Sequence, residues 1–182
     1  PTFSNVNFAT VKGIEVSLVK RMSNNFSGFL NYTFSEALVT SSLLFSQPRD
    51  LTRTFPADWD QSHTVAAGAT FDFSGNWGFS LLGSASSGLP YTYNVFQPNA
   101  ERAPFISSFD ALVYKEFEFW KINLRIYAQA INLLNRKNVW WVYPDSGKPG
   151  VDTNPATSDD YTNNPAMWGP GRRFQIGFSF SY

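Results

Sequence analysis

The stretch that decides the fold is "GRRFQIGFSFSY", residues 171–182. Its apolar residues occupy every second position and are Phe174, Ile176, Phe178, Phe180 and Tyr182. A period of two is the pattern of a β-strand that has one apolar and one polar face. Five apolar side chains on one side indicate that this strand is paired into a sheet, and that its apolar face meets a large apolar surface.

The same alternation recurs along the chain, where signals for helices are nearly absent. Seven such segments are bounded by turn-forming residues, which predicts seven β-strands. The predicted strands are residues 11–21, 26–38, 62–74, 76–86, 105–118, 120–134 and 171–182. The sequence therefore predicts an all-β fold in which residues 1–182 form one unit with no separate domain.

The connections between the predicted strands alternate in length. Tight turns of the Gly, Asn and Ser type are expected at 22–25, 74–76 and 118–120. Long connections without secondary structure of their own are expected at about 39–60, 87–104 and 135–170. Short turns at one rim and long loops at the other are typical of antiparallel, up-and-down transmembrane β-barrels, whose strands tilt by ~35–45°.

The more apolar register of each strand forms one predicted face. Its members are Ile14, Val16, Leu18, Phe26, Leu30, Tyr32, Phe34, Val65, Ala67, Ala69, Phe71, Phe73, Trp77, Phe79, Leu81, Phe109, Ala111, Val113, Phe117, Ile122, Leu124, Ile126, Ala128 and the five residues of the last strand. The aromatic ones concentrate beside the short turns, as in the interfacial girdle of a membrane barrel. Lys20 and Lys115 interrupt this register near strand ends, where their ammonium groups are expected to snorkel to water.

The opposite register carries charged and amide side chains. Its members include Glu15, Ser17, Asn31, Thr33, Thr70, Asp72, Glu116, Asn123, Arg125, Gln129, Arg173 and Gln175. This set is too polar for the dry core of a sandwich, but a water-filled lumen accepts it. The pattern predicts lipid outside and water inside, with a soluble β-sandwich or lipocalin-like barrel as the alternative.

The composition agrees with this interpretation and excludes several others. Aromatic residues make up 18% of the chain and charged residues 15%, against ~25% charged in a typical soluble domain. The net charge is zero, so no nucleic-acid partner is expected. Without cysteine there is no disulfide framework and no thiolate metal site.

An odd number of strands does not close a single-chain bacterial barrel, since such barrels have even numbers. An unclosed sheet in lipid would leave backbone donors unpaired, at several kcal/mol each. We therefore expect the chain to be an incomplete barrel segment. It would be the last part of a larger barrel, whose sequence was cut in, or just after, a long loop.

Five motifs occur in order over nearly the whole chain: "ATVKGIEVSLVKR" (9–21), "DQSHTVAAGATF" (60–71), "GLPYT" (88–92), "INLLNRKN" (131–138) and "WGPGRRFQIGFSFSY" (168–182). Together they resemble the C-terminal part of TonB-dependent outer-membrane receptors. The resemblance implies a barrel of about 22 strands with an N-terminal plug that is absent here. It also implies a receptor that binds a scarce ligand at its extracellular loops and imports it with energy from TonB.

The resemblance also implies an assembly signal in the last strand. Gln175, Gly177, Phe180 and Tyr182 match its spacing of a polar residue, a glycine and two hydrophobic residues, although Tyr182 stands where many outer-membrane proteins have Phe. The implied location is the bacterial outer membrane of a Gram-negative cell. The implied partners are outer-membrane lipid, the rest of the barrel with its plug, TonB, and the barrel-assembly machinery.

Aromatic residues in the predicted loops are the candidate ligand-binding residues. They are Trp59, Trp140, Trp141, Tyr143 and Trp168, with Tyr161 in the same loop as the last four. Such rings stack on a sugar or an aromatic ligand, or they pack the loops together. A siderophore, cobalamin, a saccharide and a peptide all remain open as the ligand.

Two further patterns bear on catalysis and metal binding. Asp60, Ser62 and His63 have the residue types of a catalytic triad, but strand neighbours point to opposite faces and there is no nucleophile elbow. The last loop carries acids suited to Ca²⁺ without EF-hand spacing, namely Asp145, Asp152, Asp159 and Asp160. We expect no enzymatic activity, no cofactor and no metal site.

The alternative functions are a non-transport barrel, such as a small porin or adhesion barrel, or a soluble lipocalin-like binder.

Overall fold

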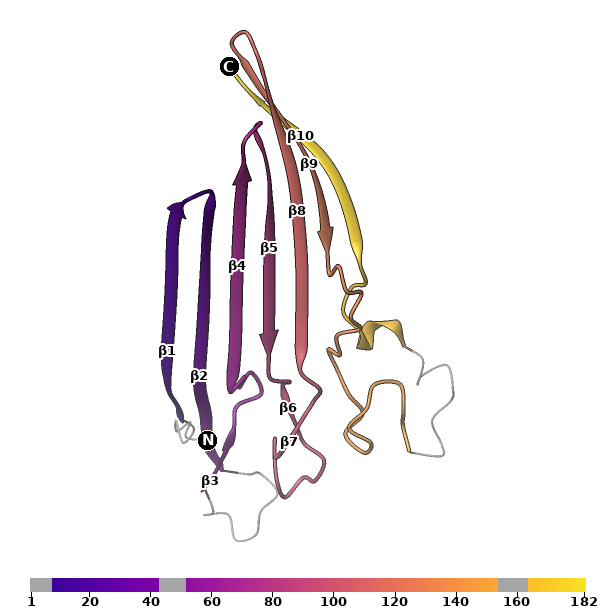
Figure 1. The fold of residues 1–182 in the computed structure, drawn as a ribbon. Helices are drawn as coiled ribbons and strands as arrows, with labels where there is room; N and C mark the ends of the chain where they lie inside the picture. The colour runs from indigo at the N-terminus through magenta and orange to yellow at the C-terminus, as the bar shows by residue number, and fades with distance from the viewer. Residues whose placement is uncertain (1–7, 43–51, 154–163) are drawn as a thin grey trace, which may run out of the picture.

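The computed structural model describes residues 8–42, 52–153 and 164–182, and it is all-β apart from one turn of 3-10 helix. Its main element is one antiparallel sheet (Figure 1). The tight turns lie together at one end of this sheet and the long connections at the other. We call these two ends the turn rim and the loop rim.

Seven long strands cross the sheet in chain order, so the topology is a meander. They are β1 (Phe8–Ser23), β2 (Phe26–Ser42), β4 (His63–Phe73), β5 (Trp77–Ser86), β8 (Ile106–Phe119), β9 (Ile122–Ile131) and β10 (Arg173–Ser181). This order confirms the predicted all-β, antiparallel arrangement of seven strands. The sheet is open, because within the described residues β1 and β10 each pair on one side only.

Several strand boundaries differ from the prediction: β2 ends at Ser42, four residues beyond its predicted end, and β1 begins at Phe8, three residues before its predicted start. The turn expected at 118–120 lies at Trp120–Lys121, because β8 runs on to Phe119 and Trp120 adopts a left-handed backbone with φ 57°. Asn132 is also left-handed, with φ 52°, and it ends β9 three residues before the predicted end. The other two tight turns lie where they were predicted.

The long connections contain short elements, so the expectation that they lack secondary structure is wrong. Strand β3 (Thr52–Pro56) pairs with the loop-rim end of β2. Strands β6 (Pro90–Tyr91) and β7 (Glu101–Arg102) pair with each other, and η1 (Pro165–Met167) is the 3-10 turn. Elements this short have no periodicity to detect, because they form only when their pairing partners are in place.

The register assigns every predicted residue set to one face. Directly paired residues share a face in an antiparallel sheet. One cross-strand row runs through apolar residues of six strands, Phe26, Phe71, Phe79, Val113, Ala128 and Ile176. Another lies on the opposite face and contains Thr70, Ser80, Leu112, Gln129 and Gln175. The two predicted faces are therefore confirmed as faces of one sheet.

Aromatic rings form a band on the apolar face near the turn rim. Phe71 stacks on Phe79 with 4.8 Å between ring centroids, and Phe73 stacks on Trp77 at 4.3 Å. Phe26 lies 4.8 Å from Phe71 in a tilted arrangement. These rings contact one another across β2, β4 and β5. They confirm the predicted grouping of aromatic residues beside the short turns.

Two glycines on the polar face lie directly beneath aromatic rings. The Phe29 ring covers Gly68 of β4, and the Tyr127 ring covers Gly177 of β10. A side chain at either glycine would overlap the ring. The absence of a side chain therefore leaves room for each ring to lie over its cross-strand glycine. The glycine of the predicted assembly signal thus has a packing role within the sheet.

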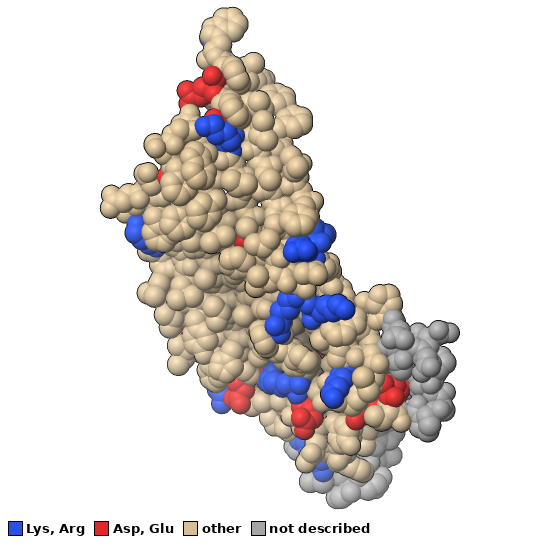
Figure 2. All heavy atoms as spheres, turned by 45° about the vertical axis from the view of Figure 1, so that its right-hand side comes forward, with Lys and Arg blue, Asp and Glu red and all other residues tan. Residues whose placement is uncertain are grey.

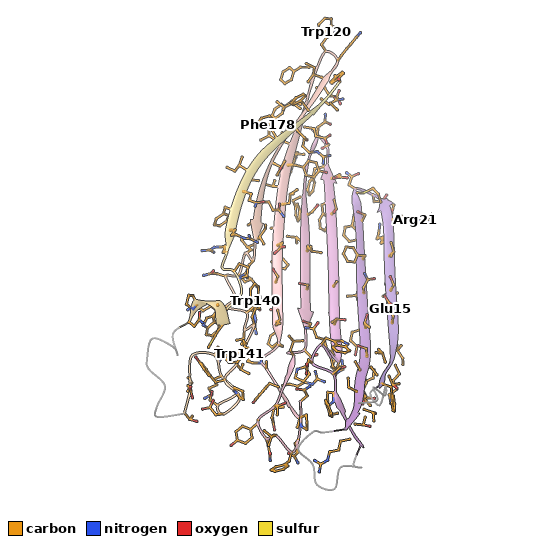
Figure 3. All side chains as sticks on the ribbon, turned by 180° about the vertical axis from the view of Figure 1, so that it is seen from behind. Glu15, Arg21, Trp120, Trp140, Trp141 and Phe178 are labelled. Carbon is orange, nitrogen blue, oxygen red and sulfur yellow. The ribbon has the colours of Figure 1, made fainter. Side chains whose placement is uncertain are left out.

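The last strand has few tertiary contacts beyond β9. Its apolar residues lie on the sheet face shared with Leu124 and Ile126. Phe178 is 71% exposed and Tyr182 is fully exposed. Figure 3 shows Phe178 on β10 near the turn rim, below Trp120 at the tip of the β8–β9 hairpin. The predicted apolar face of the last strand is therefore present, and no other element among the described residues covers it.

We expect Gly68→Ala to destabilise the sheet by about 1–3 kcal/mol, because the added methyl group displaces the Phe29 ring. Gly83→Ala is the matched control, since its nearest contact is an ordinary 3.7 Å to Phe109. The measurement is the free energy of unfolding of the purified protein in a urea titration. Equal stability of the two variants would show that the ring does not rest on Gly68.

Candidate functional site

The packed part of the described structure lies at the loop rim. The buried hydrophobic residues are Ala37, Ala57, Val139, Val142, Tyr143 and Met167, and the buried polar ones are Asp60, Asn99 and Asn132. They belong to the long connections or to strand ends next to them. The loop rim is therefore a folded layer of its own, and it is where a ligand site can be held rigidly.

The centre of this layer is an ion pair between Asp60 and Arg102. The Asp60 side chain is 1% exposed, and its carboxylate accepts hydrogen bonds from Arg102, from the Ala37 amide at 2.7 Å and from Ser62 Oγ at 3.2 Å. Arg102 also donates to the Asp60 carbonyl at 2.9 Å and to the Gly88 carbonyl at 3.3 Å. One guanidinium thus links two of the long connections of the loop rim, the one between β2 and β4 and the one between β5 and β8.

The same hydrogen bonds control the protonation of Asp60. Burial works against the charged carboxylate, but the hydrogen bonds from Arg102 and from the Ala37 amide outweigh it and lower the pKa of Asp60 below its usual value of 3.8. Asp60 is therefore ionised at neutral pH, as a partner of Arg102 must be. Neither the depth of burial of Asp60 nor its pairing with Arg102 was predicted.

Asn99 is a second link between the β3–β4 and β6–β7 connections. Its side-chain amide donates to the Pro56 carbonyl at 2.8 Å and to Asp58 at 2.6 Å. Its backbone amide donates to the Thr92 hydroxyl oxygen at 3.0 Å. Arg53 adds a hydrogen bond of 2.7 Å to the Phe96 carbonyl. These hydrogen bonds therefore join the two connections into one packed unit.

The asparagines of the "INLLNRKN" motif hold the backbone at the start of the last connection. Asn132 accepts from the Arg136 amide at 2.9 Å and donates to the Pro170 carbonyl at 3.1 Å. Asn138 pairs with both backbone groups of Ser107, at 2.9 and 2.7 Å. Asn135 accepts from the Arg172 amide at 3.0 Å. The motif positions the loop between β9 and β10.

The structure divides the predicted aromatic ligand site. Trp140 and Trp141 lie together on the last connection and are half-exposed (Figure 3). Tyr143 is 5% exposed and packs edge-on against Trp141, so its ring stabilises the loop and presents no free surface. Trp168 is partly exposed and pairs with Val139. Tyr161 lies outside the described residues.

Trp59 is separate from these rings. It lies in the β3–β4 connection and is exposed, whereas the Trp140 loop joins β9 to β10. Two strands, β5 and β8, stand between β4 and β9 in the sheet. The described residues therefore form a surface with two aromatic patches.

Sequence reasoning missed the exposed side chains of the β6–β7 hairpin. Tyr93, Val95 and Phe96 are all more than half exposed at its tip. Their signal was a run of apolar residues inside a segment that has loop composition. Because Arg53 holds the Phe96 carbonyl, this tip is fixed close to the β3–β4 connection that carries Trp59.

The three residues of the triad pattern have different partners. Ser62 and Asp60 bond to each other and to Arg102. His63 Nδ1 is hydrogen-bonded to the Tyr32 hydroxyl at 2.9 Å, and its ring lies beside Phe34. Ser62 and His63 are adjacent in the chain and thus contact different groups, as predicted from the alternation of side chains along a strand.

The acids of the last connection are only partly described. Asp145 accepts hydrogen bonds from the Thr153 hydroxyl and amide, which lower the pKa of its carboxyl below the usual value. Asp159 and Asp160 lie outside the described residues. No group of three or more His, Cys, Asp or Glu side chains that could hold a metal ion occurs among the residues that the structure covers.

Comparison with known proteins adds no relative. No protein-family model matches the chain, and no curated protein matches it. None of the helical segments among the described residues is long and apolar enough to cross a membrane. The function must therefore be inferred from the sheet and its two rims.

Asp60→Asn should destabilise the loop rim by about 1–3 kcal/mol, because Arg102 loses a charged partner that is buried. Glu101→Gln is the control, because it also removes one negative charge but from an exposed residue next to Arg102. We expect this variant to lose about 0.5 kcal/mol of stability or less. Urea unfolding and limited proteolysis of the purified variants at pH 7 measure both effects.

The effect should depend on pH in one direction. Because folding lowers the pKa of Asp60, its stabilisation is present above the usual value of 3.8 and is lost as the pH falls through the lowered value. The difference between the wild type and Asp60→Asn should persist at about pH 5. A difference that disappears between pH 7 and pH 5 would contradict the assignment.

Proposed function

We propose that this chain forms the last strands of a TonB-dependent receptor barrel in the bacterial outer membrane. The receptor binds a scarce ligand at the loop rim and imports it with energy from TonB. One observation carries the proposal: the sheet has an apolar face and a polar face from β1 to β10, and no other described element covers either.

The bare apolar face needs a large apolar partner. The chain exposes 13164 Å² of accessible surface, whereas a compact monomer of this size exposes roughly 9,000 Å². Ile14, Leu18, Ile176 and Phe178 are each at least 60% exposed on this face. Contiguous apolar patches of this extent mark a membrane or protein contact, and lipid is the partner that covers a whole sheet face.

The polar face is suited to a water-filled lumen. Arg125 pairs with Glu116 through Nε at 2.8 Å, and Ser17 donates to Asn31 at 2.7 Å. Arg125 and Ser17 are exposed and Glu116 and Asn31 are partly exposed, so water can reach this face of the described sheet. Figure 2 shows that charged side chains are sparse over much of the strand surface in that view and gather mainly toward the loop rim. Water on one face and lipid on the other is the environment of a barrel wall.

The two open edges support assembly into a larger barrel. In lipid, each unpaired backbone donor of β1 or β10 would cost several kcal/mol. Further strands that join the two edges remove this cost. The free outer edge of β10, with Gln175, Gly177, Phe180 and Tyr182, is also a template to which another strand can add. We assign these four residues to the contact with the barrel-assembly machinery.

Transport is supported by the resemblance and by the loop rim. The motifs that resemble TonB-dependent receptors include the asparagines that position the Trp140 loop. The half-exposed rings of Trp140 and Trp141 offer one stacking surface, and the exposed rings of Trp59 and Phe96 on other connections offer a second. In this proposal the plug and TonB act from parts of the receptor outside this chain.

Leu81 and Leu82 test the assignment of the faces, because they are adjacent on β5 and point to opposite sides. Leu81→Arg should cost ~2–4 kcal/mol of folding free energy if it faces lipid. Leu82→Arg faces the lumen and should cost far less. The measurement is heat-modifiable gel mobility and urea unfolding of the protein refolded into lipid vesicles. A larger cost at Leu82, or a soluble monomer without detergent, would favour a lipocalin-like barrel.

Deleting residues 180–182 should reduce the folded protein in the outer membrane several-fold, because the deletion removes the end of the β10 edge. Trp140→Ala combined with Trp141→Ala is the control, since both rings lie at the loop rim and assembly should be normal. Heat-modifiable mobility of membrane fractions reports the folded amount. Normal assembly of the shortened protein would refute the assembly role.

A further inference from the structure

The charges on the apolar face are not balanced along the strands. Within the described strands this face carries Lys12, Lys20, Glu36 and Lys115. Lys12 and Glu36 form an ion pair of 2.8 Å, which neutralises both. Lys20 and Lys115 form no ion pair in the described part of the chain, and both lie toward the turn rim. This end of the apolar face is therefore positive.

The two lysines differ in how their ammonium groups are satisfied. Lys20 Nζ donates to the Ser23 hydroxyl at 2.7 Å, to the Ser23 carbonyl at 3.2 Å and to the Phe26 carbonyl at 3.0 Å. Lys115 Nζ donates to the Gly75 carbonyl of the β4–β5 turn. An ammonium group has three donors. Lys20 has an acceptor for each of them, whereas the contacts of Lys115 leave two donors for another acceptor.

Among the residues that the structure describes, Lys115 is the one charged residue in the lining of an open groove on the apolar face, where it lies between Trp77 and Ile126 of the neighbouring strands. The groove has a volume of about 400 Å³, and its apolar lining includes Trp77, Val113, Phe117, Ile126, Ala128 and Ile176. The Lys115 ammonium lies 5.8 Å from the centre of the Phe117 ring, within the band of aromatic residues at the turn rim. The site thus joins a long apolar surface to a single cation at the level of the turns.

This combination fits an amphiphile that has an apolar tail and an anionic head. We propose that the groove binds a glycerophospholipid, with one acyl chain along the strands and the phosphate at Lys115. The proposal deepens the proposed function, because it places the turn rim at the headgroup level of a membrane. Charge complementarity selects the lipid: the apolar face has no acid beside Lys115, so an anionic headgroup meets no repulsion there.

Native mass spectrometry of the whole purified protein can test the site. The protein is released from detergent micelles that contain equimolar dioleoyl phosphatidylglycerol and dioleoyl phosphatidylcholine. We expect the wild type to retain phosphatidylglycerol preferentially. Lys115→Gln should weaken retention about fivefold, the effect of one cation near a headgroup layer. Lys115→Arg should preserve retention, and so should the control Lys20→Gln, whose ammonium is already satisfied.

A second variant tests the tail site separately. Ala128→Trp fills the groove and leaves Lys115 in place, so it should also reduce retention. Equal retention by the wild type and Lys115→Gln would overturn the proposal. Displacement by soluble glycerol 3-phosphate would do the same, because it would show a phosphate site without a lipid tail.

Insertion into pure phosphatidylcholine vesicles separates this inference from the proposed function. Insertion needs the apolar face but not the Lys115 contact. A protein that inserts but shows no preference for phosphatidylglycerol overturns the lipid site and leaves the membrane assignment standing. A protein that fails to insert overturns both.

Discussion

The backbone ladder from β1 to β10 is the constraint on which the other features of this structure depend. A shift of one residue in any pair would turn an apolar row toward the polar side. The described long strands keep one register, with an irregularity between Lys20 and Ser23 at the turn rim. Phe29 over Gly68 and Tyr127 over Gly177 add contacts that fit only this register. The faces, the aromatic band and the groove at Lys115 all follow from it.

The two rims are stabilised by different interactions. The turn rim has short hairpins with left-handed residues and stacked rings, which are local in sequence. The loop rim has a buried carboxylate, Asp60, whose partner Arg102 is 42 residues away. Burying a charge is unfavourable unless it is paired and hydrogen-bonded, so the packing of these loops depends on the contacts of Asp60 with Arg102, Ala37 and Ser62.

The proposals assign one environment to each part of the sheet. In the proposed barrel, lipid would cover the apolar face, water would fill the side that carries Arg125 and Glu116, and further strands would join the edges. The loop rim would then present the exposed rings of Trp140 and Trp141 to the outside, and Lys115 at the turn rim would lie at the opposite headgroup layer. Each assignment depends on the same alternation of side chains, so a test of the faces bears on all of them.

The sequence by itself determined the seven long strands, their antiparallel order and the membership of each face. Alternation needs only the local geometry of an extended chain, and Asn or Gly at the tight turns supplies the left-handed backbone. Only the tertiary structure decided the burial of Tyr143, the pairing of Asp60 with Arg102 and the ring above Gly68. These contacts join residues distant in the chain, and no local periodicity encodes which of them meet once the sheet has formed.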